Sequence, residues 1–229
     1  MSLVFTLLAS LASPVDAKAG NEKWTQAGSD ITLRYDGEEN GRYRNVSVMR
    51  HGKLARRIEL SERSYSLFEH DADPATSPDG RYVLVTDVES GEVASPDGDR
   101  FMHEVPYCGF MNTRSGCMVT RQTGQFCGGS FNDIGNWASP GLPPVTLTEE
   151  GATAEDYASG HRSPSDAPDG SLDNLLRCGP PGPRNRDHYR KLIDAGIFES
   201  LPRRGKRCTA ISIDRWSTAL GSTSHCLWR

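Results

Sequence analysis

The sequence has almost no long apolar runs, which excludes a protein with several membrane-spanning helices. Only Leu3–Ala12 is uncharged and mostly apolar, and it is too short to cross a hydrocarbon core of about 30 Å as a helix. Its length suits the apolar region of a secretory signal, and the residues Val15–Ala17 suit cleavage before Lys18. We therefore expect residues 1–17 to be a signal peptide, with no membrane span after cleavage. The alternative is a buried N-terminal helix.

The sequence also lacks a strong excess of charge of either sign. Its formal net charge is -4 and its pI is near 5.9. A nucleic-acid-binding domain usually has a high pI and a basic patch, so we expect no nucleic-acid partner. Arg greatly outnumbers Lys, which is typical of proteins from GC-rich bacterial genomes.

Familiar catalytic motifs are missing as well. There is no Gly-x-Ser-x-Gly turn, no Ser-x-x-Lys pair, no His-Glu-x-x-His helix and no glycine-rich phosphate loop before a helix. Asp166, Asp169 and Asp173 do not match the spacing of a calcium-binding loop. We therefore expect no catalytic residue, no bound metal and no cofactor, and a protein that is not an enzyme.

One cluster of carboxylates keeps a hydrolase open as the alternative. Glu69, Asp71 and Asp73 surround His70, and a glycosidase needs only a pair of carboxylates beside its substrate. On this alternative the protein is an extracytoplasmic hydrolase, and Asp71 and Asp73 should line one cleft of the folded chain. The simpler interpretation is a solvated polar turn.

The cysteines agree with export. An even number of cysteines in an exported chain is typical of a disulfide framework. No pair has the two-residue spacing of a zinc knuckle, which makes a metal site the weaker interpretation. The spacing of the first three suits neighbouring strands, and the last two could tie a C-terminal strand pair, but the connectivity stays open. The six are Cys108, Cys117, Cys127, Cys178, Cys208 and Cys226.

Short alternating or β-branched segments between turn signals predict a mainly β fold. We expect an antiparallel meander or sandwich with a blade-like segment, two short helices and a long irregular segment rich in Pro, Gly and Ser. The predicted strands are Ile31–Tyr35, Asn45–Met49, Leu54–Leu60, Arg81–Asp87, Val105–Met111, Cys117–Arg121 and Gln125–Phe131.

The blade-like segment is Ser77–Val85, where a Ser-Pro-Asp-Gly turn leads into a hydrophobic strand. It resembles the blade turn of β-propeller repeat families, and Asn112–Gly116 resembles the later turn that joins the strands of such a blade. The second Ser-Pro-Asp-Gly turn begins at Ser95, much closer than a blade of roughly 40 residues requires. A single sheet or sandwich therefore fits better than a full propeller.

We expect one exported domain, residues 18–229, in three parts. Residues 18–137 form the β meander, and residues 138–185 form the irregular segment with a short helix at Leu172–Arg177, capped by Ser171. Residues 186–229 contain a helix that begins after Asn185 and ends near Gly196, followed by closing strands at Cys208–Trp216 and Thr223–Trp228.

A small disulfide-bonded chain with long loops and no catalytic motif suits binding. We expect a periplasmic or secreted immunity or inhibitor protein that occludes the active site of an envelope-acting toxin enzyme. The expected contact residues are Asn112 and Arg114 on one loop and Asn132, Asp133 and Trp137 on another, with Arg114 pairing carboxylates of the enzyme. Substitution of Arg114 or Trp137 should weaken inhibition without lowering the melting temperature. A structural envelope protein, with an exposed apolar patch or sheet edge, is a further alternative.

Overall fold

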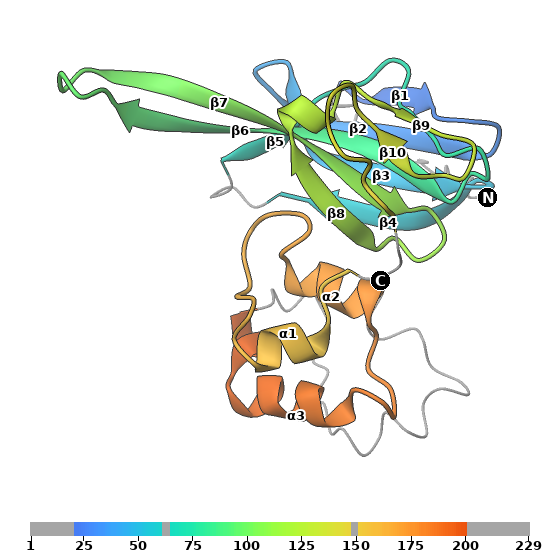
Figure 1. Ribbon diagram of the computed structural model, residues 1–229, viewed down its shortest axis with the longest axis vertical. Helices are drawn as coiled ribbons and strands as arrows, with labels where there is room; N and C mark the ends of the chain where they lie inside the picture. Colours follow the sequence, from blue (N-terminus) through green and yellow to red (C-terminus); the bar gives the residue numbers. More distant parts are fainter. Residues whose placement is uncertain (1–20, 61–64, 148–150, 201–229) are drawn as a thin grey trace, which may run out of the picture.

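The computed structural model describes residues 21–60, 65–147 and 151–200. These residues form an antiparallel sheet and a small helical lobe, and the sheet carries a long hairpin that reaches away from the rest of the molecule (Figure 1). The mainly β prediction is therefore confirmed. The predicted signal peptide, both predicted closing strands, Cys208 and Cys226 lie outside the described residues.

The first half of the sheet is a meander, β1 (Lys23–Gln26), β2 (Ile31–Glu39), β3 (Arg42–Arg50) and β4 (Lys53–Glu59). The alternation of β2 buries Ile31, Leu33 and Tyr35 while the residues between them stay partly exposed. The predicted turn between β3 and β4 is present, with positive φ at His51 and Gly52 as a tight hairpin requires.

The second half is also antiparallel and contains β5 (Ser66–Phe68), β6 (Tyr82–Ala94), β7 (Arg100–Asn112) and β8 (Met118–Thr123). The strand order is β1-β2-β3-β5-β6-β7-β8, and β4 also pairs with β3. Because β4 pairs with one end of β3 and β5 pairs at Tyr43, the two halves join as one continuous sheet.

Side chains on opposite faces of β6 enter two different cores. Val83 and Val85 pack with the apolar residues of β2 and β3, whereas Tyr82 and Leu84 pack on the other face with Phe110. The second core is covered by η1 (Gly124–Phe126), β9 (Ser130–Phe131) and β10 (Trp137–Ala138). The strand predicted for Gln125–Phe131 is therefore largely wrong: this stretch contains a 3-10 turn and only a short strand at its end.

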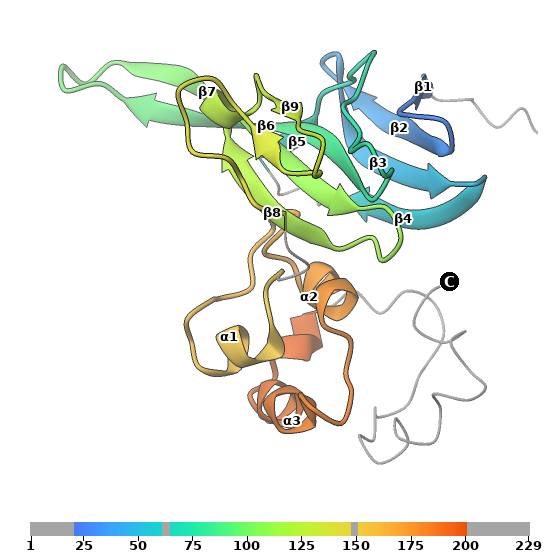
Figure 2. The same ribbon diagram turned by 45° about the vertical axis from the view of Figure 1, so that its right-hand side comes forward.

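The helical lobe contains α1 (Ala154–Ala158), α2 (Leu172–Cys178), α3 (Arg186–Asp194) and η2 (Ile197–Ser200). It lies to one side of the sheet in both views (Figures 1 and 2). It has its own hydrophobic core, in which Tyr157, Leu175 and Tyr189 are buried. Both predicted helices are present. Ser171 caps α2 as expected, but Asn185 makes no side-chain cap on α3 and instead accepts a hydrogen bond from the N–H of Gly182.

Helix α2 joins the lobe to the sheet. The side-chain amide of Asn174 accepts from the N–H of Met118 at 2.8 Å and donates to its carbonyl at 3.0 Å, as a neighbouring strand residue would. The guanidinium of Arg56, from β4, is buried and donates to Asn174 and to the carbonyl of Gly116. Burial lowers its pKa to about 10, so it stays charged at neutral pH, and Asp173 at 3.1 Å balances that charge.

Two disulfides lie in the described part of the chain. Cys108 of β7 is bonded to Cys127, which follows η1, and Cys117 is bonded to Cys178 at the end of α2. The first holds the covering segment on the sheet and the second holds the lobe on β8. In the described ranges, no helix is both long and apolar enough to cross a membrane.

Candidate binding surfaces

The first predicted contact loop is a tight turn between β7 and β8. The side-chain oxygen of Asn112 accepts hydrogen bonds from the N–H groups of Arg114 and Ser115, at 2.9 and 3.1 Å. Asn112 is only 4% exposed, so it shapes the turn rather than contacting a partner, which corrects its expected role. Gly116 ends the turn at a φ of 73° with the side chain of Arg56 against it, a place that no larger residue fits. Arg114 is left exposed.

The second predicted loop is organised in the same way by Asn132. Its side-chain oxygen accepts from the N–H groups of Ile134 and Asn136, and its own N–H donates to the carbonyl of Asn136. Asp133 and Ile134 project from this turn, and Ile134 is 80% exposed. Sequence reasoning missed Ile134, although an apolar residue between Asp and Gly in a polar loop is a detectable signal.

Trp137 is not the exposed anchor that the sequence predicted. It is 1% exposed, its indole N–H donates to the carbonyl of Phe126 at 2.6 Å, and its ring packs edge-on against Phe110 and Phe131. A tryptophan fills more core volume than any other residue, and the cover over β6 and β7 supplies a polar partner for its N–H. The segment around Trp137 therefore stabilises the second core rather than presenting an exposed tryptophan.

The Arg114 turn joins β7 and β8 of the eight-stranded sheet, whereas the Asp133 turn joins β9 and β10, which form a separate two-stranded sheet. In the described part of the chain, no hydrogen bond or ion pair joins Arg114 to Asn132, Asp133 or Trp137. The Arg114 turn is next to a disulfide, because Cys117 directly follows it, and Cys127 precedes the segment that contains the Asp133 turn. Both turns are thus held in shape by hydrogen bonds within the chain.

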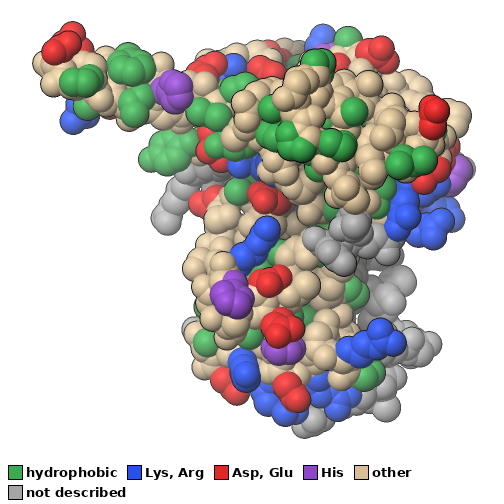
Figure 3. Space-filling model, in the orientation of Figure 1, with side chains coloured by type: hydrophobic (Ala, Val, Ile, Leu, Met, Phe, Trp, Pro, Cys, Tyr) green, Lys and Arg blue, Asp and Glu red, His purple; other side chains and the backbone are tan. Residues whose placement is uncertain are grey.

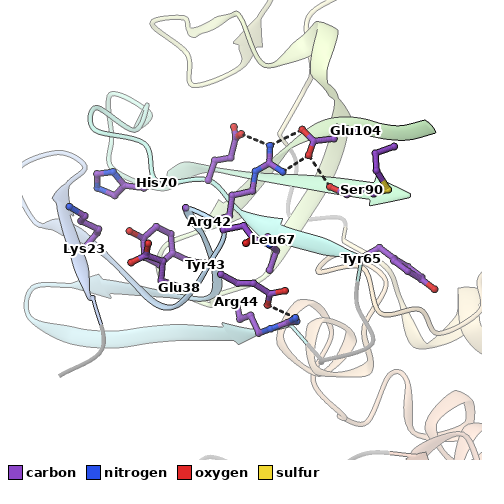
Figure 4. Close-up of a pocket in the computed structure, with 15 residues that line it drawn as sticks. Lys23, Glu38, Arg42, Tyr43, Arg44, Tyr65, Leu67, His70, Ser90 and Glu104 are labelled. Carbon is purple, nitrogen blue, oxygen red and sulfur yellow. Dashed lines mark hydrogen bonds and ion pairs between the residues drawn. The ribbon is translucent and has the colours of Figure 1, made fainter. Parts of the chain in front are cut away.

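The carboxylates around His70 do not form the arrangement expected of a hydrolase. A groove of about 1100 Å³ runs between the β2–β3 hairpin, β5 and the root of the long hairpin, and Glu69 and His70 line it (Figure 4). Asp71 and Asp73 are not among its lining residues; the Asp71 carboxylate instead accepts from the N–H of Asp73 in a turn. Glu69 lies 3.5 Å from the guanidinium of Arg42, and the imidazole of His70 shares a hydrogen bond with Thr25.

The most exposed element is one that sequence reasoning missed. Residues 90–94 of β6 and 100–106 of β7 extend past β5 and β8 and form a two-stranded ribbon, called the arm below. Val93 and Phe101 face each other across it, 42% and 52% exposed, and Met102 is 65% exposed. Figure 3 shows apolar side chains along the arm and acidic ones at its tip, where Asp97 and Asp99 lie in the turn.

The root of the arm is held by two groups of charges. Arg42 donates to both carboxylate oxygens of Glu104 at 2.7 and 2.8 Å, and these hydrogen bonds lower the pKa of Glu104 to about 2 (Figure 4). The second group joins β6, β7 and β8: Arg121 forms an ion pair with buried Asp87 and lies 3.6 Å above the ring of Tyr107. Burial raises the pKa of Asp87, and Arg121 opposes that rise.

Neither a metal site among the described residues nor a relative identifies the function. The described residues contain no group of three or more His, Cys, Asp or Glu side chains that could hold a metal ion. Asp173, one of the aspartates compared above with a calcium-binding loop, forms ion pairs with Arg56 and Arg177. Comparison of the chain with protein-family models, curated proteins and solved structures finds no match.

Proposed function

We propose that the protein is an exported immunity or inhibitor protein that binds an envelope-acting toxin enzyme and occludes its active site. The observation that supports this proposal is the pair of preformed turns, each shaped by an Asn side chain, of which the first directly precedes a disulfide-bonded cysteine. One turn presents Arg114, and the other presents Asp133 and Ile134.

Preformed turns suit inhibition because their ordering entropy is lost during folding rather than on binding, which raises affinity for a given contact area. Arg114 presents a planar guanidinium that can donate two parallel hydrogen bonds to a catalytic carboxylate of the enzyme. Ile134 supplies an apolar side chain for a pocket beside it, in the place that the sequence assigned to Trp137.

The disulfides support a location outside the reducing cytosol, where such bonds persist. Among locations outside the cytosol we propose the periplasm or the secreted fraction, because an inhibitor must bind an envelope-acting toxin there. The partner is a protein, and the proposal requires neither a cofactor nor a nucleic acid.

The test is affinity capture with the oxidised chain from residue 18 onward, applied to the envelope and secreted fractions of the source organism. Native mass spectrometry then gives the stoichiometry of any complex. We expect one degradative enzyme to bind tightly and to lose its activity in the complex. No enzyme in any fraction, or a captured enzyme that keeps its activity, would contradict the proposal.

Matched variants locate the contact surface. Arg114→Ala and Ile134→Ala should each weaken binding of the captured enzyme roughly tenfold or more, as interface anchors do, without lowering the melting temperature. Leu54→Ala is the control, because Leu54 is also exposed, at 57%, but lies in the β3–β4 hairpin. Equal weakening by Leu54→Ala would show that the two turns are not the contact surface.

A structural role in the envelope is the second candidate, and the arm favours it. An exposed ribbon with apolar side chains is the feature expected of an assembly component. Sedimentation with purified peptidoglycan sacculi distinguishes the two roles, since a structural component should pellet with them and an inhibitor of a toxin enzyme should not. The hydrolase remains an alternative, but its specific expectation, a cleft lined by Asp71 and Asp73, is not met in the groove described above.

A further inference from the structure

We propose that a second copy of this chain covers the arm, with the β7 strands of the two copies pairing edge to edge. This inference is independent of the inhibitor proposal, which concerns the two turns. It begins from the distribution of side chains on the arm. The tip, residues 95–99, is polar, whereas the exposed apolar side chains of Val93, Phe101 and Met102 lie further back along the strands.

That distribution favours pairing along the side of the arm. An element that enters a cleft tip-first needs its apolar contacts at the tip. A two-stranded ribbon is also only marginally stable in water without a third strand or a covering layer. Within residues 21–60, 65–147 and 151–200, no strand pairs with the outer edge of β7 before Tyr107, which lies opposite Thr123 at the end of β8.

The hydrogen-bonding phase of the outer edge can be read from the hairpin turn. The N–H of Ser95 donates to the carbonyl of Asp99, so the odd-numbered residues of β7 in this region direct their backbone N–H and C=O groups toward β6. Arg100, Met102 and Glu104 therefore direct their N–H and C=O groups outward. Pro106, which has no N–H, is also on the outward phase, as prolines on edge strands are.

The sequence of this edge is complementary to itself. If two β7 strands pair antiparallel about a twofold axis at Met102, each Arg100 lies opposite Glu104 of the second copy. The two Met102 residues face each other, and Phe101 lies opposite His103. All the outward N–H and C=O groups of Arg100, Met102 and Glu104 then have backbone partners. Opposite charges at paired positions stabilise a sheet, and the isologous arrangement supplies this pair twice, in addition to the ion pairs that Arg100 forms with Glu92 and Glu104 forms with Arg42 within each chain.

Another register and another occupant both fit this edge less well. If the two copies paired about His103, Arg100 would lie opposite Pro106, which cannot donate a hydrogen bond, and Glu104 would lie opposite Met102. The arm has no cluster of basic residues, since Arg100 is its one arginine, so an anionic lipid surface has no counterpart on it.

The first test is the oligomeric state of the oxidised chain by sedimentation equilibrium. We expect twice the mass of one chain at micromolar concentration. Met102→Lys brings two like charges together on the axis and should raise the dissociation constant at least about tenfold. Ile134→Lys is the matched control, since it places the same charge on another exposed apolar residue, and it should leave the dimer intact. A monomeric wild type, or a Met102→Lys variant that dimerises normally, overturns the proposal.

The second test fixes the register. Residues that form a hydrogen-bonded antiparallel pair lie about 5.5 Å apart at Cα, within the range that a disulfide spans. Met102→Cys should therefore give a covalent dimer under mild oxidation, and His103→Cys should not. Crosslinking through His103→Cys alone would overturn the proposed pairing. Neither result bears on enzyme capture, so a monomer would leave the inhibitor proposal standing.

Discussion

Single side chains decide what each exposed loop presents to solvent. Asn112 and Asn132 look like contact residues in the sequence, yet each turns its side chain inward to hold the backbone of its own turn. An Asn in a polar loop has these two uses, and the sequence alone does not distinguish them because both are compatible with Asn followed by small or polar residues. The neighbours Arg114 and Ile134 carry the exposed surface instead.

Trp137 and Ile134 should give opposite results on substitution. Trp137→Ala removes a buried side chain and one of the two donors to the carbonyl of Phe126, so it should lower the free energy of unfolding by about 3–5 kcal/mol. Ile134→Ala should change it by less than about 0.5 kcal/mol, because Ile134 is solvent-exposed. Urea denaturation of both variants checks this. A stable Trp137→Ala variant would restore the sequence-based view of Trp137 as a surface anchor.

At the scale of elements, the sequence identified those that bury one face. The alternation in Ile31–Tyr35 and the β-branched run in Arg81–Asp87 both correspond to strands, and the glycine at Gly196, with a φ of 70°, ends α3 as expected. These elements are readable because burial imposes a period on them.

The arm was missed for the opposite reason. Its residues, such as Glu92 and His103, bury neither face, so no alternation marks them as strands. Helix α1 was missed because it is short, although Thr153 and Asp156 form the capping box that marks its start. The polar junction at Arg56 could not be predicted from the sequence either, since it joins residues far apart in the chain.

The clamp at the root of the arm should survive mild acid. The pKa of Glu104 in the folded protein is about 2, below its ordinary value of 4.5, because Arg42 donates to the carboxylate. Below pH 4.5, Glu104 becomes protonated in the unfolded chain but stays ionised in the folded chain. The contribution of the Arg42–Glu104 contact to the free energy of unfolding is therefore complete above pH 4.5 and is lost as the pH falls through about 2.

An NMR titration of the Glu104 side chain checks this behaviour directly. Its chemical shift should stay at the ionised value down to about pH 3. In an Arg42→Gln variant, the midpoint should return toward the ordinary value of 4.5. A wild-type midpoint near 4.5 would show that the Arg42 contact is absent in solution.

The molecule as a whole is a sheet with a helical lobe attached at one junction. The lobe has a core of its own, and its attachment to the sheet rests on the contacts of α2 and on one disulfide. The sequence indicated a change of composition after residue 138, but it gave no means of telling that part of this segment folds as a lobe. Local composition reports loops, whereas the lobe depends on contacts between helices that are separated along the chain.

Removal of the junction disulfide should loosen the lobe before the sheet. The paired substitutions Cys117→Ser and Cys178→Ser should cost about 2–4 kcal/mol of unfolding free energy. Hydrogen exchange should accelerate in α1 and α3 more than in β2 and β3, because the sheet keeps its own core.

The paired substitutions Cys108→Ser and Cys127→Ser are the control for this experiment. They should accelerate exchange near Trp137 and leave the lobe protected, since that disulfide holds only the cover over β6 and β7. Uniform acceleration in both variants would mean that the lobe and the sheet unfold as one unit.

The two disulfides interleave along the chain, since Cys117 lies between Cys108 and Cys127 but bonds to Cys178. A chain that crosses a membrane from its N-terminus presents Cys108 and Cys117 to the oxidising compartment first. Oxidation in order of arrival would join these two, and that bond belongs to neither native pair. The native bonds then require thiol–disulfide exchange after Cys178 has been translocated, a step that takes minutes to hours without catalysis. If the chain is exported as proposed, its maturation should depend on a disulfide isomerase as well as on an oxidase.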